Sequence, residues 1–199
     1  MSDTNSASPL AAEGRRTICV FCGSSKGVKP IYAQSAWQLG TLLGRHGFDL
    51  VFGGGGIGLM DVVSQAAREA GASVTSIVPD FLHKRVAQSA HTTEVVVTGS
   101  MHERKAKMFA LADGFVSLPG GIGTLEETVE MLTWAQLELH AKPIVLLNAA
   151  GYWNELLACL QKMIVEDFAQ PKLLDMLWVA TTAEETVTLL SGRCGAPAT

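Results

Sequence analysis

Hydrophobic and polar positions follow two kinds of pattern along the chain. Short runs of β-branched and aromatic residues, such as TICVFCG at 17–23 and FDLVFGG at 48–54, predict buried strands. Longer segments between such runs, for example 30–47 and 58–71, carry apolar residues at the spacing of one helix face. The pattern therefore predicts strands and helices in alternation from residue 17 onward.

This alternation indicates the fold class. The predicted strands span 17–23, 48–54, 72–79, 92–99, 115–121, 142–148 and 177–180. The predicted helices span 30–47, 58–71, 100–114, 124–140, 152–168 and 182–192. Several strands are apolar on both faces, which is typical of a parallel sheet covered by helices on each side and connected by right-handed crossovers. We predict an α/β, Rossmann-like three-layer fold with a mostly parallel sheet.

One domain accounts for most of the chain. Its 199 residues suffice for one well-buried core, and no internal repeat or second boundary interrupts the alternation of elements. Residues 16–192 are therefore predicted to form a single domain. The segment 1–15, rich in Ser, Ala and Asn, is predicted to be a disordered tail, and 193–199 a flexible C-terminus.

Charge and hydropathy argue against two classes of partner. The chain has 15 basic and 19 acidic residues and a formal net charge of −4, which argues against broad neutralisation of nucleic-acid phosphates. A small phosphorylated molecule is compatible, because it needs only a local patch. No apolar run is long enough to span a bilayer, and the first residues lack a secretory signal pattern. We expect a cytoplasmic protein that binds neither nucleic acid nor membrane.

The four cysteines show no disulfide framework. Cys19 and Cys22 form a C-x-x-C pair, but a zinc site would need a second pair, which Cys159 and Cys194 do not form. The close pair is either a redox pair or two buried thiols on a strand. We expect no metal.

Glycine-rich motifs follow several predicted strands. They are CGSS at 22–25, GGGGIG at 53–58 and PGGIGT at 119–124, while MHERK at 101–105 opens a helix after a strand. Ligands of open parallel sheets bind outside the carboxyl ends of the strands. We therefore expect all four motifs to line one crevice.

The stretch GGGGIG has two interpretations. Gly53, Gly55 and Gly58 match G-x-G-x-x-G between a strand and a helix. Asp80 lies where a dinucleotide fold places an acid for the ribose, so the pattern favours a nicotinamide oxidoreductase. The alternative is structural, since glycines allow a tight turn and close packing of the following helix.

The stretch PGGIGTLEE at 119–127 is a candidate anion site. It lacks the lysine of a Walker loop, but the amides of residues 121–124 and the positive end of the following helix would favour a phosphate. Thr124-x-x-Glu127 is also a capping box, in which the carboxylate only satisfies a backbone amide. Alternatively, Glu127 stabilises a substrate that develops positive charge, as a sugar does when its glycosidic bond breaks. The spacing alone leaves capping and catalysis open.

The stretch SMHERK carries a similar ambiguity. Ser100-x-x-Glu103 is a capping box, and it leaves Arg104 and Lys105 near a helix start, where the helix dipole disfavours cations. These two cations either contact an anionic ligand or are solvated on the helix surface. His102 is either a general acid or a surface histidine.

The chain resembles the LOG family of cytokinin riboside 5′-monophosphate phosphoribohydrolases, formerly described as lysine decarboxylases. The resemblance covers residues 16–190 and rests on four motifs in this order and spacing: VFCGSS, GGGGIGLM, MHERK and PGGIGTLEE. It implies hydrolysis of the N-glycosidic bond of N6-modified adenosine 5′-monophosphates, such as N6-isopentenyl-AMP, or of AMP itself. The products are the free base and ribose 5-phosphate. No metal or organic cofactor is implied.

Members of this family commonly form homodimers. The apolar stretch around Trp134 and Leu137 is expected to contribute to a homodimer of this chain.

The resemblance also implies roles for individual residues. Arg104 and Glu127 would be the catalytic pair. Glu127 would stabilise the oxocarbenium-like ribose and orient or deprotonate water, while Arg104 would favour the departing base or hold Glu127 ionised. Which of the two handles the proton is left open. The substrate-binding residues would be Lys105, Gly121, Ile122, Gly123, Thr124, Leu125, Glu126 and Thr133.

A second function stays open on the same fold. A non-catalytic nucleotide- or molybdenum-cofactor-binding protein would use a similar glycine loop. The presence of both Arg104 and Glu127 favours the enzyme, because a carrier needs neither a carboxylate nor a positioned water. The sequence does not decide between prenylated adenine nucleotides and AMP as the preferred substrate.

Overall fold

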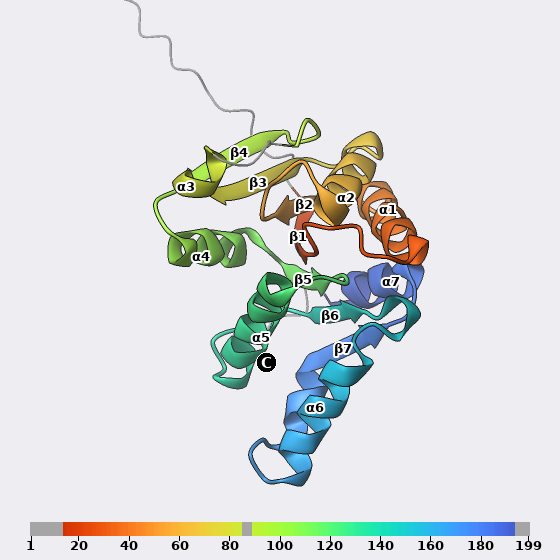
Figure 1. The fold of residues 1–199 in the computed structure, drawn as a ribbon, viewed down its shortest axis with the longest axis vertical. Helices are drawn as coiled ribbons and strands as arrows, with labels where there is room; N and C mark the ends of the chain where they lie inside the picture. Colours follow the sequence, from red (N-terminus) through yellow and green to blue (C-terminus); the bar gives the residue numbers. More distant parts are fainter. Residues whose placement is uncertain (1–13, 85–88, 194–199) are drawn as a thin grey trace, which may run out of the picture.

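The computed structural model of the chain describes residues 14–84 and 89–193. Within them, seven strands form one sheet in the order β4-β3-β2-β1-β5-β6-β7, and each neighbouring pair is parallel (Figure 1). The strands are β1 (Arg16–Phe21), β2 (Phe48–Phe52), β3 (Val74–Pro79), β4 (Glu94–Thr98), β5 (Gly114–Ser117), β6 (Ile144–Leu147) and β7 (Leu177–Ala180). The α-helices are α1 (Pro30–Arg45), α2 (Gly58–Glu69), α3 (Asp80–His83), α4 (Met101–Leu111), α5 (Ile122–Gln136), α6 (Asn154–Val165) and α7 (Ala183–Arg193). The 3₁₀ segments are η1 (Ala149–Gly151) and η2 (Pro171–Met176).

The alternation predicted from the hydrophobic pattern is confirmed. Each predicted strand and helix is present, with ends that differ by a few residues. The helix predicted from residue 124 begins earlier, at Ile122, after Gly121 in the extended N-cap conformation. The pattern does not reveal α3, η1 or η2, because segments of three to six residues are too short to show a helical period.

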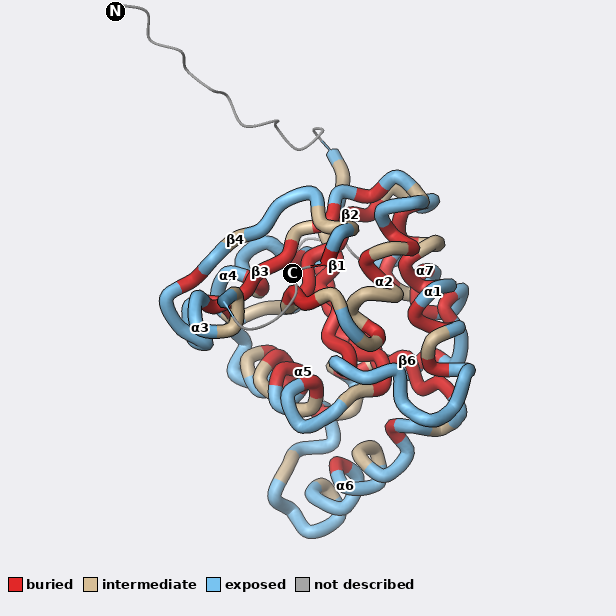
Figure 2. Tube along the Cα trace, turned by 45° about the horizontal axis from the view of Figure 1, so that its top comes forward, coloured by how far each residue is buried: buried red, intermediate tan, exposed pale blue. Residues whose placement is uncertain are grey.

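The helices lie in two layers, one on each face of the sheet. Apolar side chains of α1, α2 and α7 pack with one set of strand residues, and those of α4, α5 and α6 pack with another set. Figure 1 shows α1, α2 and α7 together on one side of the strands, with α4 and α5 on the other. Figure 2 shows the buried part of the chain concentrated along the central strands. The predicted three-layer α/β fold is therefore confirmed.

The direction in which the chain travels explains both layers. From β1 it moves outward to β4, returns through α4 to β5 beside β1, and moves outward again to β7. Because parallel crossovers are right-handed, the two opposite directions put their helices on opposite faces. The strand order reverses between β1 and β5, and such a reversal places a ligand crevice outside the carboxyl ends of these strands.

The predicted tail and flexible C-terminus lie largely outside the described residues. Of residues 1–15, only the last two are described, and Nε of Arg15 pairs with Oδ1 of Asp49 at 2.9 Å. Of residues 193–199, only Arg193 is described, and its Cζ lies 3.7 Å from the centre of the Trp178 ring. The limits of the domain stay predictions. None of the described helices is both long and apolar enough to cross a membrane.

The close crossing of α1 and α2 depends on a glycine. A Cβ atom on Gly40 would lie 2.4 Å from the carbonyl oxygen of Val63 and 2.9 Å from Cβ of Ala66. We expect Gly40→Ala to lower the free energy of unfolding by about 1–3 kcal/mol, because the backbone of α2 must move, although alanine itself favours a helix. Urea denaturation followed by circular dichroism measures this change.

Gly192→Ala is the matched control, because a Cβ atom at that position would meet no atom within 4 Å. This variant should be as stable as the unmodified protein or slightly more stable. Equal stability of the two variants would show that the packing of α1 on α2 does not require Gly40.

Candidate active site

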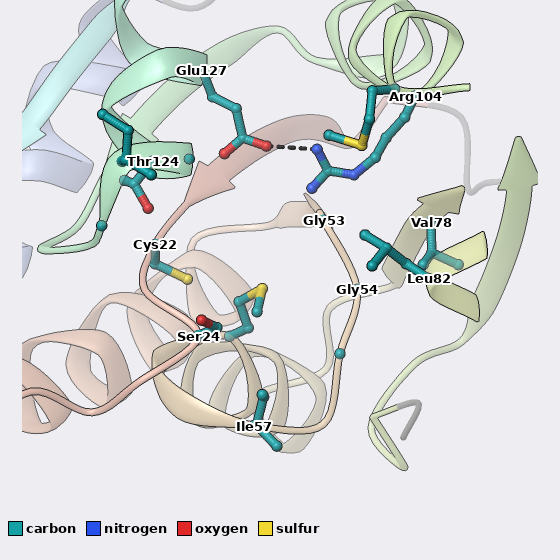
Figure 3. Close-up of a pocket in the computed structure, with 16 residues that line it drawn as sticks. Cys22, Ser24, Gly53, Gly54, Ile57, Val78, Leu82, Arg104, Thr124 and Glu127 are labelled. Carbon is teal, nitrogen blue, oxygen red and sulfur yellow. Dashed lines mark hydrogen bonds and ion pairs between the residues drawn. The ribbon is translucent and has the colours of Figure 1, made fainter. Parts of the chain in front are cut away.

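A cavity of about 550 Å³ lies at the carboxyl edge of the sheet. Its walls come from the loops after β1 and β2, the end of β3, and helices α2, α3, α4 and α5 (Figure 3). Each of the four motifs expected to line one crevice contributes to it, for example through Cys22, Gly53, Arg104 and Thr124. The expectation that these motifs share one crevice is confirmed.

Glycines allow the loops at this edge to lie against one another. The amide of Gly23 donates to the carbonyl oxygen of Pro119 at 3.1 Å, which joins the loop after β1 to the loop after β5. A Cβ atom on Gly58 would lie 2.3 Å from the carbonyl carbon of Ser24, and φ of Gly58 is 66°. Any other residue at this position would be strained and would displace the loop after β1.

The glycines of GGGGIG therefore have structural roles, and the dinucleotide interpretation loses its ribose-binding acid. Asp80 does not line the cavity. Its side chain is 53% exposed and pairs with Lys84, the C-cap residue of the same short helix. A nicotinamide dinucleotide would have no carboxylate at the position where this interpretation requires one.

Arg104 of α4 and Glu127 of α5 meet at the cavity. Nη1 of Arg104 donates to Oε1 of Glu127 at 2.6 Å, and Nε donates to the carbonyl oxygen of Ile77 at 3.1 Å. The two residues are buried, with exposed fractions of 7% and 9%, and both line the cavity. Figure 3 shows the guanidinium and the carboxylate directed toward each other. The two side chains that the resemblance names as catalytic are therefore in direct contact.

The carboxylate of Glu127 does not cap α5. The helix begins at Ile122, its N-cap residue is Gly121, and no side chain caps it. Thr124 therefore lies within the first turn, and Glu127 is paired with Arg104 instead. The capping interpretation is wrong for Glu127, because the helix starts before the residue that the box would use as its cap.

At the start of α4 only half of the predicted capping box forms, because the carboxylate of Glu103 accepts a hydrogen bond from the amide of Gly99 at 2.7 Å and not from that of Ser100. Oγ of Ser100 accepts a hydrogen bond from the amide of Glu103 at 3.1 Å. Lys105, two residues further along, has a side chain that is only 10% exposed, and its Nζ pairs with Glu126 and, at 3.0 Å, with Glu130. Neither cation of MHERK is thus a solvated surface charge, and that interpretation is wrong. His102 is exposed and does not line the cavity.

Burial controls the protonation of Glu127. Removal of the carboxylate from water raises its pKa above the ordinary value of 4.5, and the charge and hydrogen bond of Arg104 offset part of this rise. The carboxylate therefore takes up a proton more readily than an exposed glutamate does, and Arg104 is the main group that keeps it ionised.

The two close cysteines are buried thiols without a disulfide bond. Cys19 packs in the apolar cluster on one face of the sheet, and Cys22 packs in the cluster on the other face. Burial is the main cause of the raised pKa of each thiol, and the negative charge of Glu127 adds to it. These contacts favour the interpretation of two buried thiols. Among the described residues, no group of three or more His, Cys, Asp or Glu side chains could hold a metal ion.

The first turn of α5 forms an anion cradle, which we define as the backbone amides of residues 121–124. The amide of Leu125 bonds to the carbonyl oxygen of Gly121 at 3.1 Å, so the helical hydrogen-bond ladder begins there. The preceding amides have no acceptor within the helix, and they point outward from its positive end. All four residues of the cradle line the cavity, which makes this wall favourable for an anion such as phosphate.

The residues named from the resemblance fall into two groups. Those that line the cavity are Arg104, Gly121, Ile122, Gly123, Thr124 and Glu127. Those that do not line it are Lys105, Leu125, Glu126 and Thr133. Leu125 packs against the apolar core, and the exposed Thr133 hydroxyl donates to the carbonyl oxygen of Val129 at 2.7 Å. Contacts of the second group with substrate stay predictions.

An apolar wall of the cavity was missed by sequence reasoning. It consists of Ile57, Met60, Val78, Leu82 and Met101. Figure 3 shows Val78 and Leu82 across the cavity from Thr124 and Glu127. Ile57, Met60 and Met101 lie inside the quoted motifs, but no sequence signal separates Val78 and Leu82 from ordinary core residues.

The comparisons with known proteins identify the family. A family model described as possible lysine decarboxylase matches residues 60–190. The cytokinin riboside 5′-monophosphate phosphoribohydrolase LOG3 of Arabidopsis thaliana is 47% identical over 172 residues, which are 86% of this chain and 80% of that protein. The chain belongs to the LOG family. The probable phosphoribohydrolase LOGL5 of Oryza sativa subsp. japonica, another relative, is 46% identical over 170 residues, covering 85% of this chain and 69% of that protein.

A solved structure shares the fold of this LOG-family chain. The molybdenum cofactor binding protein from the phototrophic bacterium Rippkaea orientalis matches with a TM-score of 0.70 and 25% sequence identity. The match covers 91% of this chain and 98% of that protein. The same architecture therefore occurs in a protein with a different described ligand, so the function must be argued from the residues of the cavity.

Gly53 provides the space for the guanidinium of Arg104. A Cβ atom on Gly53 would lie 1.8 Å from Nη2 of Arg104, and Gly53 is not among the glycines with positive φ. We expect Gly53→Ala to displace the guanidinium and break its hydrogen bond to Glu127. The free energy of unfolding should fall by about 3–5 kcal/mol, as for other broken buried ion pairs. A crystal structure and urea denaturation, with Gly192→Ala as the control, measure the two effects. An intact ion pair in the variant would contradict this role.

The pKa of Glu127 provides a separate test of the ion pair. Titration of its side-chain carboxyl carbon by NMR should give a pKa above 4.5. Because the positive charge of Arg104 lowers this pKa, Arg104→Gln should raise it further, whereas Arg68→Gln on the exposed surface of α2 should not change it. A Glu127 pKa that falls in Arg104→Gln would refute the electrostatic coupling.

Proposed function

We propose that this LOG-family chain is a phosphoribohydrolase. It hydrolyses the N-glycosidic bond of N6-modified adenosine 5′-monophosphates, AMP or both, and releases the free base and ribose 5-phosphate. The observation that carries the proposal is the buried pair of Arg104 and Glu127, which borders the same cavity as the anion cradle. The printed names of the relatives from Arabidopsis and rice support the same reaction.

The anion cradle would bind the 5′-phosphate. Its amides donate hydrogen bonds, and the dipole of α5 adds a favourable field at short range. Thr124, which is buried at the cavity wall, would add a hydroxyl donor. Glu127 lies about one helical turn beyond Thr124, so the ribose attached to a phosphate held there would extend along the carboxylate.

Glu127 would act on the ribose. As the bond between the base nitrogen and the anomeric carbon breaks, positive charge develops on the sugar, and a carboxylate stabilises it. Glu127 would also orient a water molecule and accept its proton while the water oxygen bonds to the anomeric carbon. The proton then passes to the departing base, so the charges balance. A carboxylate whose pKa is raised by burial is better suited to accept a proton than an exposed one.

Arg104 would have a supporting role in the same step. Its hydrogen bond keeps Glu127 ionised and directs one carboxylate oxygen, which leaves the other oxygen for the sugar or the water. The guanidinium also lies next to the apolar wall that includes Val78 and Met101, where it would favour negative charge on the departing base.

The apolar wall would bind the base. Ile57, Met60 and Leu82 offer contacts to an aromatic ring or to an apolar substituent on N6, but few hydrogen bonds. This composition supports an adenine that carries a prenyl group. Comparison of turnover with N6-isopentenyl-AMP and with AMP measures the preference.

Two other functions have less support. A lysine decarboxylase would need a lysine for pyridoxal phosphate, but among the described residues that line the cavity none is lysine, and Lys105 is bound by two glutamates. A non-catalytic carrier of a nucleotide or of molybdenum cofactor would bind its ligand without releasing a base, and the assay below distinguishes it from the enzyme.

We also infer a homodimer and a cytoplasmic location. The dimer is supported by Leu137 and Leu139 at the end of α5, which are each 63% exposed. Trp134, expected to contribute to the same surface, is instead half-buried and packs edge-on against Phe109 of its own chain at 5.0 Å between ring centres. The cytoplasmic location rests on the absence of any disulfide framework in the cysteine pattern.

Release of free base tests the proposed reaction. Incubation with N6-isopentenyl-AMP or AMP should give the free base and ribose 5-phosphate, detected by chromatography. Glu127→Gln and Arg104→Gln should each lower kcat by about a hundredfold to ten-thousandfold, because each removes a group that acts in the bond-breaking step.

Glu155→Gln on the exposed side of α6 is the matched control and should leave kcat unchanged. Near-normal turnover in either cavity variant would show that the pair is misassigned. The absence of any free base with the unmodified protein would refute the phosphoribohydrolase.

A further inference from the structure

A tyrosine outside the cavity holds the loop that leads into the anion cradle. Tyr152 follows η1 in the connection between β6 and α6, and it does not line the cavity. Its hydroxyl donates a hydrogen bond to the carbonyl oxygen of Gly120 at 2.5 Å. Gly120 directly precedes Gly121, the first residue of the cradle and the N-cap of α5.

This hydrogen bond controls the direction of a cradle amide. The carbonyl of Gly120 and the N–H of Gly121 belong to one trans peptide unit, so they point in opposite directions. With the oxygen held toward Tyr152, the N–H of Gly121, a residue that lines the cavity, is directed away from Tyr152. Glycine on both sides of this peptide makes the opposite orientation accessible. That orientation would place a carbonyl oxygen, instead of a donor, in the cradle, where it would repel an anion.

The tyrosine is itself held by its neighbours. Its ring packs edge-on against Tyr32 of α1 at 5.6 Å and against Trp153 at 4.9 Å between ring centres. The backbone amide of Trp153 donates to Oδ1 of Asn148 at 2.7 Å, and its indole N–H donates to the carbonyl oxygen of Ser117 at 3.3 Å. The hydroxyl of Tyr152 therefore has a fixed position relative to the end of β5 and the loop that follows it.

We propose that Tyr152 is a positioning residue for the anion cradle and thereby sets the affinity of the site for the 5′-phosphate. The proposal rests on the proposed function for the identity of the anion. Tyr152 has no contact with the Arg104–Glu127 pair in the structure, so it acts on phosphate binding and not on the bond-breaking step. Its loss should raise KM without lowering kcat.

Tyr152→Phe tests this role, because it removes the hydroxyl and keeps the ring. Isothermal titration with ribose 5-phosphate should give a Kd about three- to tenfold higher than that of the unmodified protein, as expected for loss of one hydrogen bond. KM for N6-isopentenyl-AMP should rise by a similar factor, while kcat should stay unchanged.

Tyr32→Phe is the matched control. It removes a hydroxyl from the neighbouring ring, and no hydrogen bond of that hydroxyl to the cradle loop is present among the described residues. This variant should keep the Kd, KM and kcat of the unmodified protein. A merely structural role of Tyr152 would instead lower the urea midpoint and reduce kcat, with little change in KM.

The outcomes separate this role from the proposed reaction. If the unmodified protein releases base and Tyr152→Phe keeps the same Kd and KM, the positioning role is refuted and the phosphoribohydrolase stands. If ribose 5-phosphate binds more weakly to Tyr152→Phe but no protein releases base, the role of Tyr152 stands and the reaction is refuted. Failure of the unmodified protein to bind ribose 5-phosphate would overturn the positioning role.

Discussion

The buried contact between Arg104 and Glu127 is the constraint on which the cavity depends. Neither charge is stable in this position alone, because burial of an unpaired ion costs several kcal/mol. The contact therefore fixes the approach of α4 to α5. It also requires that the loop after β2 has no side chain at Gly53, since a Cβ atom there would overlap the guanidinium. The carbonyl of Ile77 in β3 binds the same guanidinium, so one arginine joins three parts of the fold.

This contact divides the cavity into two parts of different polarity. On one side lie the amides at the start of α5, which favour an anion, and on the other lie apolar residues such as Val78 and Leu82. The ion pair is between them. A nucleoside monophosphate has the same order of properties along its length, with phosphate, sugar and aromatic base in sequence. The match between these two orders supports the proposed substrate class more strongly than the fold does, because the fold also occurs in a cofactor-binding protein.

Most of the fold could be predicted from the sequence, because the strands are short apolar runs and each α-helix longer than one turn has apolar residues at helical spacing. The orientation of neighbouring charged residues could not. Arg104 and Lys105 are adjacent on α4, and consecutive helix residues point in directions about 100° apart. One of them lines the cavity and the other pairs with Glu126 and Glu130 outside it. The role of Glu127 could not be predicted either, because a glutamate three residues after a threonine fits both a capping box and a catalytic carboxylate. The structure distinguishes the two roles, because α5 already begins at Ile122, before Thr124 could be its N-cap residue. The apolar wall could not be predicted either, since its residues resemble core.

The return of the chain from β4 to β5 has a consequence for folding. β5 enters the sheet beside β1 only after the intervening strands and helices have been synthesised, and such non-local parallel pairing is intrinsically slow to form. Arg104 precedes this step in the chain and Glu127 follows it. A nascent polypeptide that has completed β1 to α4 thus carries the guanidinium without its partner. Catalytic competence would therefore arise in one late event, the docking of β5 and α5, and not gradually as the chain leaves the ribosome.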